Sequence, residues 1–208
     1  AQTVDGSTLQ RSVSPLITVS AIAVEGRIVM VIDDFDETSL SVVDDTNDGI
    51  PVTSSVIAPE AIGNERDLYV MKTSVNGAVQ LSVDDPLLPN LLIFDSVATG
   101  QGERRVTWDG EDGDATRVDD TGLENEDITS GGEALGLQLQ IGADLPGGTA
   151  VVRLYSDDGN ASTANRFSTA SLAIPQTGGT VPFLAEFLPF SDFTASSGGG
   201  ADFENIGA

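Results

Sequence analysis

The chain has 208 residues with no cysteine and no histidine, and its 33 acidic against 9 basic residues give a net charge of −24. The missing cysteines exclude disulfides and thiolate metal sites, and the missing histidines exclude a Ser-His-Asp triad. A charge this negative argues against nucleic acid or an anionic membrane surface as a partner, because both would repel the protein.

Two features of the sequence favour an exported protein. The chain opens at Ala1-Gln2-Thr3 without a methionine, as expected after a signal peptidase has cut behind a small residue. No run of eighteen apolar residues occurs, so we expect no membrane insertion. The sequence therefore predicts an extracellular or cell-surface protein after signal-peptide removal.

The N-terminal region differs from the rest of the chain. A polar arm ends at Pro15, and Leu16–Val24 follows with small apolar residues at alternate positions. Such alternation places one set of side chains on a single face of a strand. We expect residues 1–26 to form an arm with an N-terminal extension strand, and residues 27–208 to form one β-sandwich domain.

The remaining chain is dominated by a period of two, which is typical of half-buried strands. Turn formers separate these runs, and Asn76-Gly77 is a strong hairpin signal. The predicted strands are Ile28–Ile32, Val52–Ile57, Leu68–Thr73, Val79–Val83, Leu91–Val97, Arg104–Trp108, Leu135–Ile141, Ala150–Tyr155, Arg166–Ile174 and Val181–Phe187. No helical apolar stripe is present, so the sequence predicts an all-β, jelly-roll-like antiparallel sandwich.

Carboxylates crowd the glycine-containing segment that follows Trp108. They are Asp109, Glu111, Asp112, Asp114, Asp119 and Asp120. Ca²⁺ takes about six to eight oxygen ligands, often from a flexible loop. The spacing is not that of an EF-hand, but the crowding of carboxylates makes this loop a candidate calcium site. The alternative is that these are solvated loop carboxylates, as expected in so acidic a chain.

From Val31 onward, a series of short motifs follows one order along the chain. The motifs are Val31–Phe35, Gly63–Leu68, Val106–Gly110, Asp119–Leu123, Asp127–Thr129, Tyr155–Ser162, Phe190–Phe193 and Gly199–Ala208. In these motifs the chain resembles a group of secreted bacterial β-sandwich proteins, common in cyanobacteria, that often carry a C-terminal PEP-CTERM sorting signal. The resemblance implies a jelly-roll-like sandwich at a cell surface or in extracellular matrix, and implies no known activity.

The sequence departs from that group at its C-terminal end. In the resembling sequences, the stretch like Asn205–Ala208 runs on into one more apolar strand, and a sorting tail follows; here both are absent. We therefore expect the sandwich to lack its last strand. An open edge of this kind exposes unpaired backbone groups and core side chains, which is costly.

Strand donation between subunits would repair such an edge. The donor residues would be Leu16, Ile17, Val19, Ala21, Ile22, Ala23 and Val24, and the acceptor edge would lie near Asn205 and Ile206. Because the contact is head-to-tail, it would repeat into a homopolymer. The sequence thus predicts a structural subunit of an extracellular fibre or surface layer. Two alternatives remain open: Leu16–Val24 completes its own domain, or the natural protein continues beyond Ala208.

The alternative function is a surface-attached, lectin-like jelly-roll module that binds extracellular polysaccharide. Such modules use exposed aromatic side chains, but aromatic residues make up only 5 % of this chain. Trp108 is expected in the core because it continues an alternating strand. We expect no enzyme, since neither a GxxxxGK[ST] phosphate loop nor a GxSxG nucleophile motif occurs.

Overall fold

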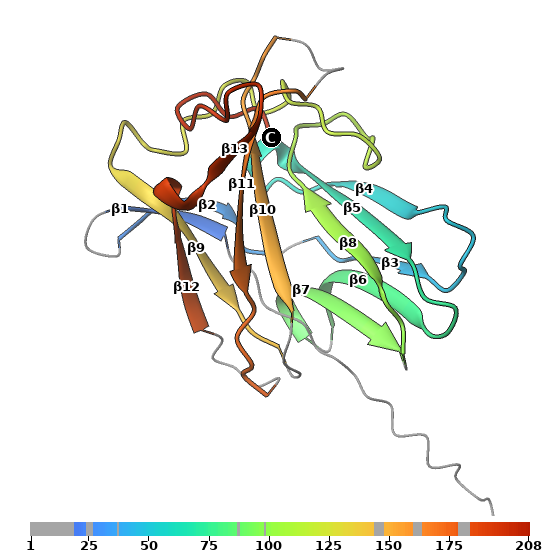
Figure 1. Ribbon diagram of the computed structural model, residues 1–208. Helices are drawn as coiled ribbons and strands as arrows, with labels where there is room; N and C mark the ends of the chain where they lie inside the picture. Colours follow the sequence, from blue (N-terminus) through green and yellow to red (C-terminus); the bar gives the residue numbers. More distant parts are fainter. Residues whose placement is uncertain are drawn as a thin grey trace, which may run out of the picture.

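The computed structural model describes residues 19–23, 27–36, 38–86, 88–97, 99–143, 148–159, 164–178 and 184–208. These residues form thirteen strands and two short 3₁₀ turns, and the pairings between named strands are antiparallel (Figure 1). The predicted all-β class is confirmed, with a β-sandwich-like arrangement, while the jelly-roll connectivity stays a prediction. Within the described residues, no helix has the length and apolarity needed to span a membrane.

The strands fall into two groups along the chain. The first group is β1 (Val19–Ala23), β2 (Ile28–Asp33), β3 (Leu40–Asp44), β4 (Val52–Ile57), β5 (Glu65–Lys72), β6 (Ala78–Asp85), β7 (Leu88–Val97) and β8 (Gly102–Thr107), with the 3₁₀ turn η1 (Ile62–Asn64) before β5. A long loop then leads to β9 (Ala134–Ile141), β10 (Thr149–Tyr155), β11 (Phe167–Ala173), β12 (Leu184–Pro189) and β13 (Thr194–Ser197), with η2 (Phe190–Asp192) between the last two.

The strands are arranged in four sheets, with the orders β12-β9-β1-β2, β10-β11-β13, β3-β6-β7 and β4-β5-β8. Figure 1 shows the first sheet on the left and the last two on the right, with the long loop running over the top. β1 lies in the interior of its sheet, between β9 and β2. The N-terminal extension strand therefore belongs to the sandwich-like body in this structure.

Apolar alternation explains why these segments form strands with one buried face. In β9, Leu137, Leu139 and Ile141 are at most 2 % exposed, while Gln138 and Gln140 between them are less buried. Burying each such side chain contributes about 1.5–3 kcal/mol relative to leaving it exposed. Core residues from all four sheets form one cluster, which includes Ile32, Leu68, Leu81, Leu139 and Ala170.

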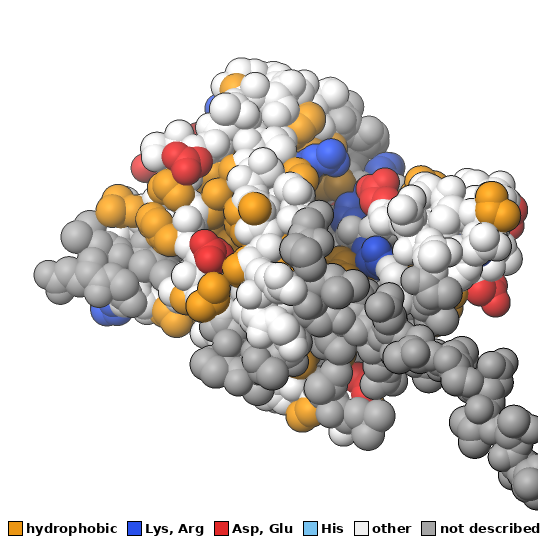
Figure 2. Space-filling view, turned by 60° about the horizontal axis from the view of Figure 1, so that its bottom comes forward, with side chains coloured by type: hydrophobic (Ala, Val, Ile, Leu, Met, Phe, Trp, Pro, Cys, Tyr) orange, Lys and Arg blue, Asp and Glu red, His pale blue; other side chains and the backbone are white. Residues whose placement is uncertain are grey.

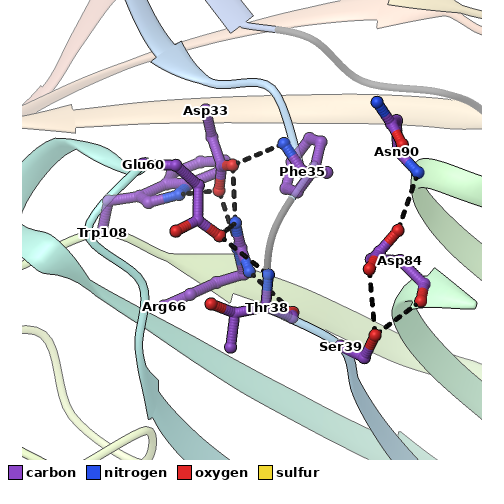
Figure 3. Close-up of polar contacts among 9 residues, drawn as sticks. All are labelled: Asp33, Phe35, Thr38, Ser39, Glu60, Arg66, Asp84, Asn90 and Trp108. Atoms are coloured by element: carbon purple, nitrogen blue, oxygen red, sulfur yellow. Dashed lines mark hydrogen bonds and ion pairs between the residues drawn. The ribbon is translucent and has the colours of Figure 1, made fainter.

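A buried polar network ties β2, β5 and the end of β8 together (Figure 3). Asp33, the last residue of β2, accepts hydrogen bonds from the Arg66 guanidinium, from Trp108 Nε1 at 2.7 Å and from the Phe35 backbone N–H at 2.9 Å. Glu60 adds a second carboxylate 3.2 Å from Arg66. Each carboxylate oxygen of Asp33 accepts two hydrogen bonds. These bonds compensate the free-energy cost of burying its charge.

The C-terminal residues lie inside the fold and not along an open edge. Ile206 is 1 % exposed and forms bridges to Glu126 on one side and Ser156 on the other. Gly207 passes so close to Asp120 that an added Cβ would lie 1.6 Å from its carbonyl oxygen. The expected acceptor edge near Asn205 and Ile206 is therefore wrong for this structure, because the backbone there is already paired on both sides.

Candidate functional site

β1 is the first feature with a possible function, because it is hydrogen-bonded on both sides. Its residues pair antiparallel with β2, with Ser20 opposite Val31, and with β9, with Ser20 opposite Gln138. Of the predicted donor residues, Val19, Ala21, Ile22 and Ala23 lie in β1. Leu16, Ile17 and Val24 lie outside the described residues. β1 therefore occupies, within its own chain, the place that a donated strand would take.

The pairing of β1 is irregular, which sets it apart from most other pairings. Its register with β2 shifts twice within four residue pairs, and its register with β9 shifts once. By contrast, β9 and β12 keep one register over six pairs, and β10 and β11 over seven. Each shift leaves a residue unpaired and disrupts the ladder locally. β1 is thus less regularly bound than the strands around it.

The second feature is an acidic pocket between β5 and the loop that follows β8. Carboxylate oxygens of Glu65, Asp67 and Asp112 all lie within 4.8 Å of one another. Alternation along β5 explains the placement: Glu65 and Asp67 share one face, and Arg66 points to the other, toward Asp33. Glu65 Oε1 also accepts a hydrogen bond from the Gly113 N–H at 2.7 Å, which fixes the loop against β5.

Asp67 is the most unusual member of this pocket. It is 1 % exposed, and neither of its carboxylate oxygens has a hydrogen-bond partner. Burial is the main cause that raises its pKa to about 6, and Glu65 and Asp112 add to the rise. Ser55 and Asp109 lie close enough to oppose this rise in the pKa, but neither makes a hydrogen bond of normal geometry to Asp67.

Asp109 lies beside this pocket and is also buried, with 1 % exposure. Its Oδ2 accepts a hydrogen bond from the Asp119 N–H at 2.8 Å. Burial raises the pKa of Asp109 to about 8, and the charges of Asp67, Asp112 and Asp119 add to the rise. Register explains this proximity: Asp67 is opposite Thr107, two residues before Asp109.

The structure separates the six predicted metal ligands. Asp112 belongs to the pocket and Asp109 adjoins it, whereas Glu111 is exposed and lines a groove with Glu124. Asp114 Oδ1 accepts hydrogen bonds from Thr116, and Asp119 Oδ1 accepts them from Thr121, so both shape local turns.

Sequence reasoning missed Glu65 and Asp67. Both acids come just before the predicted strand Leu68–Thr73, and the available signal was that they are two residues apart, as side chains on one face of a longer strand would be.

Asp120 lies in a different environment. It has no exposed surface, and neither of its carboxylate oxygens has a hydrogen-bond partner. Burial is the main cause that raises its pKa to about 6, and Asp158, Asp119 and Asp157 add to the rise. Of the predicted six-residue cluster, Asp109 and Asp112 thus lie near β5 and Asp120 lies near Asp157 and Asp158 at the end of β10, while the other three residues belong to neither place.

The aromatic side chains relevant to sugar binding have partners within the protein. Trp108 donates its indole N–H to Asp33. The Arg105 guanidinium lies 4.6 Å from the Tyr69 ring centroid, and Tyr155 packs against Phe167 at 5.0 Å between centroids. The expectation that Trp108 serves the core is consistent with this arrangement. Polysaccharide binding stays a prediction.

Comparison with known proteins adds no relative: no family model matches the sequence, and neither a curated protein nor a solved structure matches it. The resemblance to PEP-CTERM-associated proteins therefore stays an expectation from the motifs. Function has to be inferred from the arrangement of β1 and of the carboxylates.

Proposed function

We propose that this protein is a structural subunit of an extracellular fibre or surface layer, and that subunits assemble by exchanging β1. The observation that carries this proposal is the position of β1: an N-terminal segment of five residues is hydrogen-bonded on both sides, between β2 and β9. A strand in such a position can be supplied by its own chain or by a neighbour, since the backbone pairings are the same in both cases.

The proposed acceptor is the gap between β2 and β9. When β1 leaves its own chain, β2 loses the strand it pairs with and β9 keeps only β12, so an open gap with two unpaired edges results. Because that gap accepts only an antiparallel strand with the right alternation, the β1 segment of another copy is the best-matched occupant. This acceptor replaces the edge near Asn205 and Ile206 that the sequence suggested.

The short connection between β1 and β2 favours exchange over a tight hairpin. Only residues 24–27 join Ala23 to Ile28, and in extended form they reach at most about 17 Å. Short connecting segments are recognised hinges for domain swapping.

The proposed exchange is head-to-tail and gives a linear assembly, whereas reciprocal exchange between two subunits would stop at a dimer. Each subunit gives β1 to one neighbour and receives it from another, so the contact is heterologous and does not close upon itself unless a ring forms. The net charge of −24 suits a soluble, extracellular subunit. The role is that of a building block, and no catalytic step is part of the proposal.

Two variants of the connection between β1 and β2 test the proposal. Replacing Glu25 and Gly26 with proline stiffens the connection in an extended form, which hinders the hairpin and favours exchange. Inserting six Gly/Ser residues after Glu25 relaxes the hairpin and favours the single chain. The mass distribution of the full chain is measured by light scattering after size exclusion, and particle shape by negative-stain electron microscopy.

The expected result is an ordered series. The proline variant forms the largest oligomers or fibres, the natural chain is intermediate, and the Gly/Ser variant is mostly monomeric. Circular dichroism shows whether each variant retains its β-structure, so that an unfolded protein is not counted. Folded monomers for all three proteins, over the full concentration range, would contradict the proposal.

A further inference from the structure

We propose that Glu65, Asp67 and Asp112 bind one calcium ion that fastens the loop following β8 to β5. This site goes beyond the strand-exchange function and does not depend on it. It also differs from the predicted loop site, because two of its three carboxylates come from a strand. Asp109 lies close to Asp67 and Asp112 and positions the start of the loop through its hydrogen bond with the Asp119 N–H.

The buried, unpartnered carboxylate of Asp67 is the observation that points to a ligand. Two other buried aspartates in the structure have donors: Asp33 has the Arg66, Trp108 and Phe35 groups, and Asp44 accepts hydrogen bonds from the Lys72 and Thr46 N–H groups. Asp67 has none and lies within reach of Glu65 and Asp112. A buried carboxylate without a donor is strongly unfavourable unless a proton or a cation compensates it.

The geometry and the donor atoms fit calcium. Calcium–oxygen distances of about 2.3–2.6 Å allow two ligand oxygens on one ion to be up to about 5 Å apart. The oxygens of Glu65, Asp67 and Asp112 satisfy this limit, since all lie within 4.8 Å of one another. All three donors are carboxylates, which suit a hard cation. Magnesium keeps several of its waters and is usually bound by one or two carboxylates, so a cluster of three carboxylates with a buried member suits calcium better.

The loop is arranged so that its ligand can reach the strand. Gly113 N–H donates to Glu65 Oε1, and Asp112 Oδ1 accepts the Asp114 N–H at 2.7 Å, which leaves Asp112 Oδ2 for the ion. Gly110 has a φ of 85° and packs against the Gly122 backbone, where an added Cβ would lie 2.6 Å from an oxygen. Gly110 and Gly122, which bracket the part of the loop that carries Asp112, are thereby held together.

Calcium titration of the full chain tests this site. The protein is first freed of metal with EDTA and dialysed, and calcium chloride is then titrated at physiological salt, which limits unspecific binding to the acidic surface. Isothermal calorimetry gives the stoichiometry and affinity, and the midpoint of thermal unfolding gives an independent readout. We expect one saturable site and a rise in the unfolding midpoint. No saturable heat together with no change in midpoint at millimolar calcium would overturn the proposal.

Three variants locate the bound ion. Asp67→Asn keeps the side-chain shape and removes the charge, and we expect it to weaken calcium binding at least tenfold while raising the unfolding midpoint of the metal-free protein. Glu65→Gln provides a second ligand variant with the same expected loss of affinity. Asp120→Asn is the matched control, since Asp120 is equally buried and unpartnered but lies outside the pocket; we expect it to bind calcium like the natural chain.

Other results would contradict the assignment. Natural affinity in both Asp67→Asn and Glu65→Gln would place the ion elsewhere on the acidic surface, and loss of binding only in Asp120→Asn would place it near the end of β10. Magnesium binding as tight as calcium binding would overturn the assignment of the metal.

Discussion

The Arg66 guanidinium contacts both carboxylate oxygens of Asp33, at 2.6 and 2.7 Å, and neither side chain has any exposed surface. The two residues are 33 positions apart and belong to different sheets. A two-point ion pair of this kind fixes orientation as well as distance. The contact therefore sets how the β2 end of one sheet meets β5 of the other.

Removing one partner of this pair should be strongly destabilising. We expect Arg66→Met to lower the free energy of unfolding by about 3–5 kcal/mol, because Asp33 would be left as a buried charge with only the Trp108 and Phe35 donors. Urea unfolding followed by Trp108 fluorescence measures the loss. Arg117→Met is the control: Arg117 and Asp114 form an exposed pair 3.9 Å apart, and such solvent-screened pairs contribute little to stability. Equal losses in the two variants would contradict the role given to Arg66.

The C-terminal segment should contribute to stability like a core element. Ile206 is 1 % exposed, whereas Leu184, on β12, is 50 % exposed. We expect Ile206→Ala to cost about 2–5 kcal/mol, since it removes buried methyl groups and leaves a cavity. Leu184→Ala should cost far less, within about 1 kcal/mol. Urea unfolding of both variants makes the comparison, and a small loss for Ile206→Ala would show that this segment is not packed as described.

The free energy of unfolding should depend on pH through the titration of Asp120. Its pKa is raised to about 6 from the ordinary 3.8, mainly by burial, so the folded state binds this proton more tightly than the unfolded state. The resulting stabilisation is fully present below pH 3.8 and is lost as the pH rises through about 6. We therefore expect the metal-free natural chain to lose stability relative to Asp120→Asn between pH 4 and pH 7. Thermal unfolding in EDTA measures the difference, and parallel curves for the two proteins would contradict the environment assigned to Asp120.

Assembly should depend on ionic strength because of the net charge. Each subunit carries −24, so subunits repel one another until salt screens them, and the screening length falls from about 30 Å at 0.01 M to about 3 Å at 1 M salt. We expect light scattering by the natural chain to rise with sodium chloride, and to rise equally with potassium chloride at the same ionic strength. Scattering that falls as salt is added would contradict assembly through backbone pairing between like-charged subunits.

The alternation of apolar residues was sufficient to predict most of the strands. β9 and β10 were expected within a residue or two of their observed bounds, because each buries one face and exposes the other. β3 was missed, since Leu40–Asp44 is short and merges with a run of turn-forming residues. β13 was missed because Thr194–Ser197 is exposed at every position and is held by backbone pairing with β11. Such a strand leaves no apolar pattern to detect.

The acidic pocket could be predicted only in part. The loop composition indicated Asp112 and Asp109, because carboxylates crowd a glycine-containing segment. Glu65 and Asp67 are more than 40 positions earlier in the chain, and they meet the loop only through the pairing of β5 with β8. No local pattern specifies that pairing. The same reason explains the misplaced acceptor edge, since the neighbours of β1 and of Ile206 are set by long-range contacts.

A disulfide trap tests strand exchange most directly, and the absence of cysteine from the chain makes it unambiguous. Ser20 on β1 is directly opposite Gln138 on β9, and Phe187 on β12 is opposite Gln138 on its other side. Opposed residues of antiparallel strands are close enough for a disulfide. Ser20→Cys combined with Gln138→Cys therefore reports which chain supplies β1, and Phe187→Cys combined with Gln138→Cys is the control that must link within one chain.

After oxidation of assembled material, a non-reducing denaturing gel separates the outcomes. Exchange of β1 predicts a ladder of covalent dimers, trimers and larger species for the Ser20→Cys/Gln138→Cys protein, and monomers alone for the control. Complete oxidation of the Ser20→Cys/Gln138→Cys protein to monomers alone would show that each chain keeps its own β1, which would contradict the central claim.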